Sequence, residues 1–479
     1  MNAFKGFGLT AAAAVLATSA LAADDFTLED VPDLSGTPPI HVALEAGGGA
    51  DLIIPFLEKF AEASGVEVTH ESMVFATLYS KQIVELQGGT GAYDLVVTET
   101  SWTNEWEDYL MPMEELAAEY DPDGVEGFRA YMAGHDPGIL RMASTRNGTL
   151  AGVPYYTYTM INIYREDLIE DPTEKAAFEE KYGYELAVPT TLAELRDVAE
   201  FFTREAGETL KGETLEKPIY GVSMMAGRFP HVQDEVTAIL WGEDGRWART
   251  VRDDGGNVTG FRVTDEDMAK LEEAFALYQE LMTFAPPGSE NAFWDFATAQ
   301  FVEGNTAMIP FMYAPLWNWS NDVGKNAAGG RSAAAPVVGE RPYTGAFHFA
   351  PSRDSGNPAA AYWLLKYIGS KATQQEMAET GWASARRDAL EAVMDSDAED
   401  AYRKFGWIAP TLAQWDAQEP DVDSYLHFNS RAFGKLYEQM TIIGHENAIG
   451  QITPARAVEN WKRALQRFQN RFDDARLVD

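Results

Sequence analysis

Aromatic and hydrogen-bonding side chains gather in segments that the sequence predicts to be loops. The chain contains 12 Trp and 20 Tyr. Aromatic rings stack on the apolar C–H faces of sugars, and side chains that offer paired donors and acceptors bind the polar rims. These residue types predict a site for a polyhydroxylated small molecule, and the clusters below are its candidate contacts.

The first cluster follows residues 93–97, an apolar run with the composition of a buried parallel strand. Glu99 can accept two hydroxyl hydrogen bonds, Ser101 can add one, and Trp102 can stack on a ring. Ligands of open α/β sheets bind beyond the carboxyl ends of the strands, so this position favours a ligand contact. The alternative is a helix N-terminus with Thr100 or Ser101 as its cap and Trp102 in the core, and the two roles can coexist.

The second cluster is the tyrosine-rich segment 153–160, VPYYTYTM. Successive side chains of an extended chain point to opposite faces, so Tyr156 and Tyr158 share one face and Tyr155 takes the other. Burying all three phenols would require three hydroxyl partners and is costly. We therefore expect at least one tyrosine to line a ligand site, with Tyr156 and Tyr158 as the candidates.

Further candidates follow other predicted strands. Tyr313 and Trp317 follow the predicted strand 307–311, and Arg228 follows the predicted strand 219–223. The planar guanidinium of Arg228 can bind a hydroxyl pair or an acidic group, or it can form a surface ion pair. The remaining candidate contacts are Glu45, Tyr79, Trp294, Gly345, Phe347, His348 and Arg386.

For several of these residues a structural role competes with a ligand contact. Gly345 permits close approach of a ligand to the backbone. His348 is more typical of a structural histidine than of a catalytic base, and Trp294 is more typical of a core residue. Of the neighbours Arg386 and Arg387, one is expected to reach the site.

Motifs of covalent and metal chemistry are missing from the sequence. It has no G-x-S-x-G elbow, no phosphate-binding G-x-x-x-x-G-K loop and no H-E-x-x-H helix. The seven His are scattered without zinc-ligand spacing, and there is no Cys. We therefore expect no catalytic residue, no metal site and no cofactor. A glycosidase needs two inward-facing carboxylates, and a single sequence leaves that alternative open.

Helices that alternate with short apolar strands must position these residues. Residues 40–100 predict the order β-α-β-α-β, with a first helix that ends at Gly65 and carries Pro55 in its first turn. Residues 324–340 are predicted to be a loop, and further helices are predicted at 191–206, 266–284, 295–303, 357–369 and 453–472. Right-handed crossovers make such a chain an open α/β sheet, and 479 residues predict at least two domains.

The first residues have the pattern of a secretory signal peptide. Lys5 precedes a mostly apolar run from Phe7 to Ala20, and 20–22 place small residues where a signal peptidase reads. The run is short for a membrane span. We expect residues 1–22 to be cleaved and the mature chain to be periplasmic, where a lack of Cys avoids mispaired disulfides.

Charge and hydropathy disfavour other classes of protein. The formal net charge is −38, so the chain lacks the basic surface that nucleic-acid binding requires, and binding to anionic lipid is disfavoured too. No later stretch is long and apolar enough for stable membrane insertion. The excess of acidic residues is typical of a highly soluble protein.

The order of several segments resembles that of the family 1 extracellular solute-binding proteins, which include maltose-binding protein. These segments are FLEKFAEASGVEVTHES, YDLVVTETSW, AGVPYYTYTMINIYREDLI, VPTTLAELRDVAEFFT, FVEGNTAMI and GAFHFAPSRDSGNPAAAYWLLKYIGSKATQQEMAETGWASARRDAL. No one segment is specific, but their order spans nearly the whole mature chain. Leu192 stands where the family's P-x-T-W-x-E-L helix usually has Trp.

The resemblance implies a two-lobed α/β periplasmic-binding-protein fold with three interlobe crossings and a central ligand cleft. On this analogy residues 24–157 and 346–395 form the N-terminal lobe, and residues 158–345 and 396–479 form the C-terminal lobe. The family's usual ligands are mono- and oligosaccharides and polyols, which pass to the permease of an ABC importer. We therefore expect a monomeric sugar-binding protein that closes around its ligand and is not an enzyme.

Other ligands and roles stay open at this point. A secreted carbohydrate-active enzyme would turn its ligand over, and a scaffold or sensor would differ only in its docking partner. A polyamine would need several acidic groups in the cleft, of which Glu99 is one. A sugar acid would need Arg228 or Arg386 to face inward.

Overall fold

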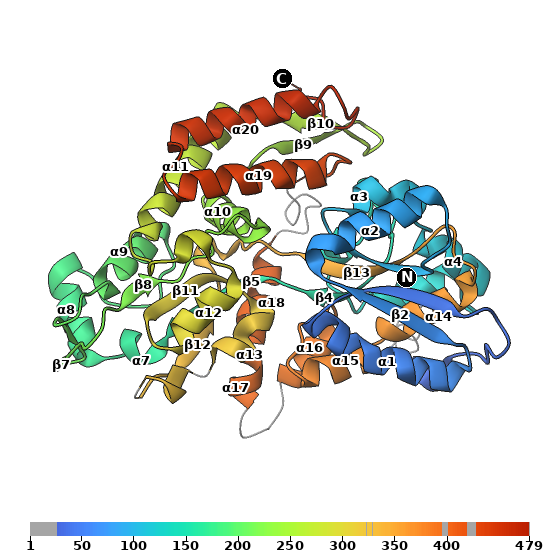
Figure 1. Cartoon of the computed structure of the whole chain (residues 1–479), viewed down its shortest axis with the longest axis horizontal. Coiled ribbons are helices and arrows are strands. Elements are labelled where there is room, and N and C mark those ends of the chain that lie inside the picture. The colour runs from blue at the N-terminus through green and yellow to red at the C-terminus, as the bar shows by residue number, and fades with distance from the viewer. Residues whose placement is uncertain (1–25, 322, 328, 395–400, 419–427, 479) are drawn as a thin grey trace, which may run out of the picture.

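Two α/β lobes lie side by side in the computed structural model, which describes residues 26–321, 323–327, 329–394, 401–418 and 428–478 (Figure 1). Each lobe is built around its own β-sheet, and the chain passes between the sheets at residues 158–159 and 336–345. The predicted signal peptide, residues 1–22, and the predicted third crossing at residues 395–396 lie outside the described residues.

The sheet of the N-lobe has five strands in the order β2-β1-β3-β13-β4. β1 pairs in parallel with β2 and β3, whereas β13 pairs antiparallel with β3 and β4. The strands are β1 (Ile40–Glu45), β2 (Val68–Met73), β3 (Leu95–Glu99), β4 (Val153–Thr157) and β13 (Ala346–Pro351). The helices of the same chain segments are α1 (Gly48–Ser64), α2 (Phe75–Gly88), α3 (Thr103–Trp106), η2 (Glu107–Tyr109), α4 (Met113–Tyr120), α5 (Gly124–Met132), α6 (Pro137–Met142), α14 (Pro358–Ile368), α15 (Lys371–Glu379) and α16 (Arg387–Met394).

The sheet of the C-lobe has four strands in the order β12-β5-β11-β8. They are β5 (Met160–Arg165), β8 (Tyr220–Val222), β11 (Thr306–Tyr313) and β12 (Ser332–Ala335), and two small hairpins pair β6 (Thr209–Leu210) with β7 (Glu213–Thr214) and β9 (Arg249–Arg252) with β10 (Val258–Arg262). The α-helices are α7 (Glu166–Ile169), α8 (Pro172–Tyr182), α9 (Leu192–Phe202), α10 (Pro230–Gly242), α11 (Asp265–Met282), α12 (Trp294–Val302), α13 (Trp317–Ser320), α17 (Ala401–Phe405), α18 (Ile408–Ala417), α19 (Phe433–Ala448) and α20 (Pro454–Phe468).

Two helix ends illustrate how local sequence signals set the helix boundaries. Gly65 ends α1 in a left-handed conformation with a φ of 73°. Thr191 and Glu194 form a capping box at the start of α9. The prediction that Pro55 lies in the first turn of α1 is wrong, because the helix already begins at Gly48, inside the glycine run. Pro55 therefore lies within α1, where it lacks the N–H that an interior residue donates.

The predicted loop at 324–340 contains an edge strand. Residues Ser332–Ala335 form β12, which pairs antiparallel with β5. Alanine and serine have little intrinsic preference for strands, so pairing with β5, and not composition, makes this segment extended.

Two hydrophobic cores underlie the two sheets. The N-lobe core contains Phe60 and Trp106, and the C-lobe core contains Trp247 and Trp461. Leu390 of α16 packs into the C-lobe core although it precedes the predicted third crossing. No helix among the described residues has both the length and the apolar character of a membrane span.

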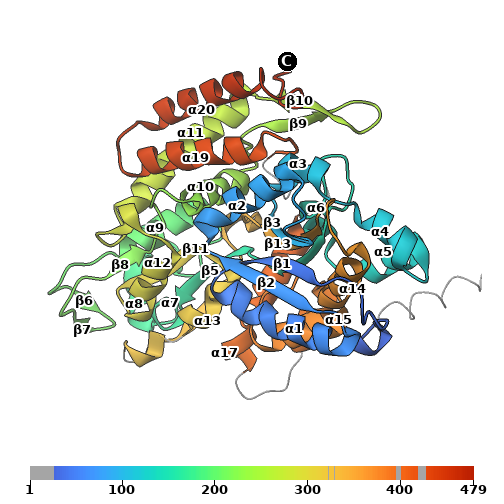
Figure 2. The same cartoon turned by 45° about the vertical axis from the view of Figure 1, so that its right-hand side comes forward.

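One helical layer reaches from the C-lobe to the N-lobe. α11, α19, α20 and the β9–β10 hairpin form this layer, and α19 contacts α3 of the N-lobe (Figure 2). This contact is separate from the chain crossings between the sheets.

Candidate ligand-binding site

Two carboxylates end neighbouring strands of the N-lobe sheet. Glu45 is the last residue of β1, and Glu99 is the last residue of β3. Because β1 and β3 are parallel neighbours, their carboxyl ends meet at the same edge of the sheet. Glu99 is buried and Glu45 is partly buried, so both side chains lie in a shielded position at the junction of the lobes.

Protein donors bind both carboxylate oxygens of Glu99. The hydroxyl of Tyr158 donates to Oε1, and the backbone N–H of Ser101 donates to Oε2 over 2.8 Å. The Ser101 hydroxyl donates to the same Oε2. Since Tyr158 lies between β4 and β5, this carboxylate connects the N-lobe sheet to a chain crossing.

The C-lobe contributes a second buried carboxylate, Asp234, from α10. The hydroxyls of Tyr313 and Tyr437 donate to its two oxygens, the latter over 2.9 Å. The Tyr437 hydroxyl also lies 3.3 Å from the hydroxyl of Tyr343, and the ring of Tyr343 lies 6.2 Å from that of Tyr158. Glu99, Tyr158, Tyr343, Tyr437, Asp234 and Tyr313 thus form one tyrosine–carboxylate network that spans both lobes.

Burial sets the protonation of this region. It raises the pKa of Glu45 to about 7, with help from the charge of Glu99. Burial also raises the pKa of Glu99, against the opposing effect of its hydrogen bonds from Ser101 and Tyr158. It raises the pKa of Asp234 well above its ordinary value too. The network therefore contains neutral phenol donors beside carboxyl groups that retain a proton more readily than exposed carboxyl groups do.

Aromatic rings form a continuous band through the same junction. The band runs from Tyr79 through Trp102 and Phe75 to Phe347, and then through Tyr158, Tyr313, His231, Phe293 and Trp294 to Trp319, with centroid separations between 4.3 and 6.3 Å. Tyr156 joins it beside Phe347 at 5.8 Å. Phe75 and Trp319, which lie in different lobes, are 41% and 54% exposed, so apolar ring surface is accessible on both sides of the junction.

The sequence matches the family model of the bacterial extracellular solute-binding proteins over residues 42–375. This chain belongs to that family. Its two sheets, joined at residues 158–159 and 336–345, are the framework of a two-lobed periplasmic binding protein.

Solved structures of similar proteins share the fold of this solute-binding protein. An ABC transporter solute-binding protein from Agrobacterium radiobacter K84 in complex with ribitol is 20% identical, with a TM-score of 0.66, and the match covers 91% of this chain and 100% of that one. A protein from Agrobacterium vitis S4 with bound D-mannitol is 16% identical, with a TM-score of 0.65 and coverage of 91% and 100%. Maltose-bound MalE3 from T. maritima is 16% identical, with a TM-score of 0.64 and coverage of 90% and 100%. No curated protein matches the sequence.

Many of the predicted contacts of this solute-binding protein come together at the junction. Glu45, Glu99 and Ser101 lie at the strand ends, and the rings of Tyr79, Trp102, Tyr156, Tyr158, Trp294, Tyr313 and Phe347 lie in the band. Tyr155 points into the N-lobe core and stacks on Phe349, as the alternation of an extended chain predicts. Trp102 has a core role as well, since it packs on Trp106.

Other predicted contacts are structural residues. Trp317 is fully buried and donates its indole N–H to the backbone of Arg403, so it is not a stacking platform. Arg386 is also fully buried, and its guanidinium pairs with Asp388 and donates to the backbone of Tyr131 within the N-lobe. Arg228 is exposed and lies next to Phe229.

Gly345 and His348 serve the protein in other ways than predicted. A Cβ atom at Gly345 would lie 2.1 Å from the ring of Tyr158, so the close approach that this glycine allows is used by Tyr158. His348 is buried, and its Nε2 lies 3.0 Å from the Thr103 hydroxyl. Burial lowers the pKa of His348 to about 3, so its ring is neutral near pH 7.

Several residues of the site escape prediction from sequence. They are Phe75, His231, Asp234, Phe293, Tyr343 and Tyr437. Asp234 lies next to Glu235 within α10, and burial raises the pKa of Glu235 to about 8. A pair of acids in a helix is typical of a solvated face, so its burial depends on distant tyrosines, which bind Asp234 from β11 and α19 and Glu235 from α11.

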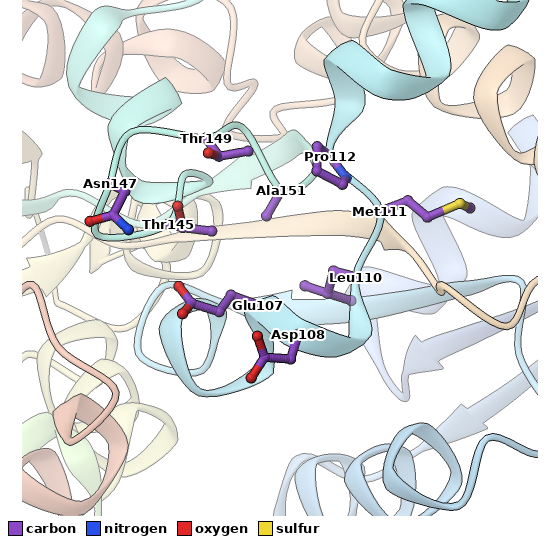
Figure 3. A pocket seen from close by; sticks show the side chains of 9 residues that line it. All are labelled: Glu107, Asp108, Leu110, Met111, Pro112, Thr145, Asn147, Thr149 and Ala151. Carbon is purple, nitrogen blue, oxygen red and sulfur yellow. The ribbon is translucent and has the colours of Figure 1, made fainter. Parts of the chain in front are cut away.

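A separate pocket of about 230 Å³ lies in the N-lobe. Figure 3 shows Glu107 and Asp108 on one side and Thr145, Asn147 and Thr149 on the loop opposite. None of the predicted contacts lines this pocket. Within the described part of the chain, no group of three or more His, Asp or Glu is placed to hold a metal ion.

Proposed function

We propose that this chain is the periplasmic binding component of an ABC importer and that it binds a neutral carbohydrate, a polyol or small sugar, between its lobes. The observation that carries the proposal is the meeting of the aromatic band and the tyrosine–carboxylate network at Tyr158. Rings offer apolar faces for C–H groups, and the network offers acceptors and phenol donors for hydroxyls.

The charges of the junction favour a neutral ligand over a sugar acid. The network contains no Lys or Arg that could pair with an anion, and Glu45, Glu99 and Asp234 repel an anion whenever they are ionised. The two arginines considered for an acidic ligand are exposed (Arg228) or paired with Asp388 (Arg386). The ribitol, D-mannitol and maltose bound by similar proteins are consistent with a neutral polyhydroxylated ligand.

Lobe closure is the proposed mechanism. A ligand that contacts both halves of the network binds the closed state better than the open state, and this difference shifts the population toward the closed state. The membrane permease then recognises the closed monomer. No covalent step is required, so the ligand leaves chemically unchanged.

A thermal-shift panel tests the ligand class. The panel contains ribitol, D-mannitol, maltose, D-gluconate and spermidine, each titrated against the mature chain. We expect a neutral compound to raise the Tm, because a ligand at 100 times its Kd stabilises the folded state by about 2.7 kcal/mol. Stabilisation by gluconate or spermidine alone would overturn the neutral-ligand proposal.

Two substitutions test the site. Tyr156→Ala and Trp102→Ala are expected to abolish the thermal shift, because each removes a ring of the band. Tyr120→Ala is the matched control, since Tyr120 contacts Tyr362 on the N-lobe and is outside the band. A full shift in both site variants would refute the placement, and ligand altered after incubation with the protein would indicate an enzyme.

Export is tested on the expressed protein. We expect the mature N-terminus to begin at Ala23 and the protein to be released with the periplasmic fraction. An intact Met1 on the folded protein would contradict the periplasmic location.

A further inference from the structure

Four charged residues form a closed ring of ion pairs and hydrogen bonds where the helical layer meets the N-lobe. The guanidinium of Arg431 donates to Glu107 over 2.6 and 2.9 Å, and Arg146 pairs with the same carboxylate over 2.8 Å. Asp474 completes the ring, since it lies 3.4 Å from Arg146 and accepts the backbone N–H of Arg431 over 2.9 Å. Positive and negative groups alternate around this charge ring.

The charge ring takes two residues from each lobe. Glu107 directly follows Trp106 of the N-lobe core, and Arg146 lies in a loop whose backbone bonds Asn104. Arg431 precedes residues of the C-lobe core, and Asp474 is followed by another. Every ion pair that joins an acid of one lobe to an arginine of the other must break if the lobes separate.

The side chains of the charge ring are shielded from water. The exposed fractions are 4% for Asp474, 13% for Glu107, 17% for Arg146 and 35% for Arg431. Ion pairs of this kind are screened less by salt than pairs on an open surface, and loss of one partner leaves the other charge poorly solvated. Further contacts lie alongside, because Arg141 donates to Asn429 over 2.7 Å and Arg252 donates to the backbone of Arg146 over 3.2 Å.

The charge ring is continuous with the ligand site through the first turn of α19. A Cβ atom at Gly434 would lie 3.6 Å from the carbonyl oxygen of Ser101, and Lys435 lies over the ring of Tyr79 at 5.7 Å. Arg431 lies just before the start of α19. Tyr437, about one turn into that helix, donates to Asp234. Movement of this helix end away from Glu107 would therefore also change the tyrosine–carboxylate network.

We propose that the charge ring is an interlobe latch that stabilises the closed state in part of the ligand-free population and positions the first turn of α19 over the site. Arg431 is its central positioning residue, because it contacts Glu107 with its side chain and Asp474 with its backbone. Figures 2 and 3 show the elements involved, α19 beside α3 and the η2 turn that carries Glu107 and Asp108. The latch sets how much of the free protein is already closed, and it therefore sets the apparent ligand affinity.

Spin-label distances test the latch on the ligand-free protein. The chain has no Cys, so cysteines introduced at Glu58 on α1 and Ala299 on α12, both exposed, are the only thiols to label. Arg431→Gln and Glu107→Gln are expected to lower the closed, shorter-distance share of the electron-spin distance distribution relative to the unsubstituted protein. Arg431→Lys, which keeps the charge, is expected to restore part of the closed population.

Salt supplies a test that needs no ring variant. Raising NaCl from about 20 mM to about 0.5 M shortens the screening length, and because Arg431 is 35% exposed, we expect part of the unsubstituted protein to move toward the longer distance. Arg129→Gln is the matched control, because it removes an exposed arginine that pairs with Glu114 and Glu126 within one lobe. This variant is expected to keep the unsubstituted distribution.

One pattern of results overturns the proposal: unchanged distances in Arg431→Gln, in Glu107→Gln and at high salt. The inference rests on the proposed closure of two lobes, but its test uses no ligand. If only the latch proposal is wrong, carbohydrates still raise the Tm in the thermal-shift panel. If only the carbohydrate proposal is wrong, the spin-label distances still depend on salt as the latch predicts.

Discussion

Burial moves the titration of Glu45 into the neutral pH range. Burial, and then the charge of Glu99, raises its pKa from 4.5 to about 7. Between these pH values the folded chain binds more protons at Glu45 than the unfolded chain, so the contribution of Glu45 to stability falls as the pH rises. We expect Glu45→Gln to gain on the order of 2 kcal/mol relative to the unsubstituted protein between pH 5 and pH 8.

Urea unfolding at both pH values measures this difference, in which the other titrating groups cancel. Glu58→Gln is the control, because it removes an acidic side chain at an exposed position on α1. A pH-independent difference for Glu45→Gln would show that Glu45 has an ordinary pKa in the folded chain.

Gly345 gives a steric prediction at the same scale. Gly345→Ala would bring a Cβ atom to 2.1 Å from the Tyr158 ring, so the ring must move away from Glu99 and Phe347. We expect a loss of about 1–3 kcal/mol of stability, as for other overpacked sites, and a weaker thermal shift by ligand. Gly356→Ala is the control, because nothing lies within 4 Å of its added Cβ. Equal behaviour of the two variants would contradict the assignment.

The sequence identifies residues whose positions follow from local geometry, and it misses those that depend on distant packing. Glu99 ends a buried strand and Tyr158 follows an alternating one, so their direction can be predicted. Asp234 is buried by Tyr437, far along the chain, and no local pattern signals this. Arg386 also depends on distant packing. Its local sequence suggests a ligand contact, but its guanidinium donates to the backbone of Tyr131 over 3.2 Å inside the N-lobe.

At the scale of elements, α9 offers a clean test of local stability. Thr191→Ala removes the hydroxyl that accepts the N–H of Glu194, and we expect the free energy of unfolding to fall by about 1 kcal/mol. Ligand binding should be unchanged, because α9 contributes no ring to the band. Thr173→Ala, on the exposed first turn of α8, is the control, and an equal loss there would argue against the capping contribution.

Long amphipathic helices are the elements that periodicity predicts best. The helix predicted at 266–284 is α11, Asp265–Met282, and the one predicted at 357–369 is α14, Pro358–Ile368. The failures lie where tertiary contacts override composition. β12 is extended because β5 pairs with it, and α1 starts within glycines that by themselves favour a turn.

At the scale of the whole molecule, the net charge of −38 produces self-repulsion that salt relieves. We expect the Tm to rise as NaCl increases from about 20 mM to about 0.5 M, with the same rise in KCl because screening does not depend on the cation. Salt is expected to weaken the latch while it raises the Tm, so stability and lobe opening should increase together. A falling Tm would mean that ion pairs outweigh the repulsion.

The two-lobed arrangement was predictable only through the family resemblance and the alternation of helices and strands. The order of strands within the sheets was not, because β13 inserts between β3 and β4 although the whole C-lobe sheet separates it from β4 in sequence. Local periodicity carries no information about such a distant partner.

The insertion of β13 also determines when the N-lobe sheet can be completed during translation. A nascent polypeptide that has been translated up to residue 345 already contains β3 and β4, but β13, which pairs with both, has not yet been synthesised. The two bare edges are templates for pairing with other chains. The sheet of the first domain to be translated is thus completed only when the segment 346–351 emerges.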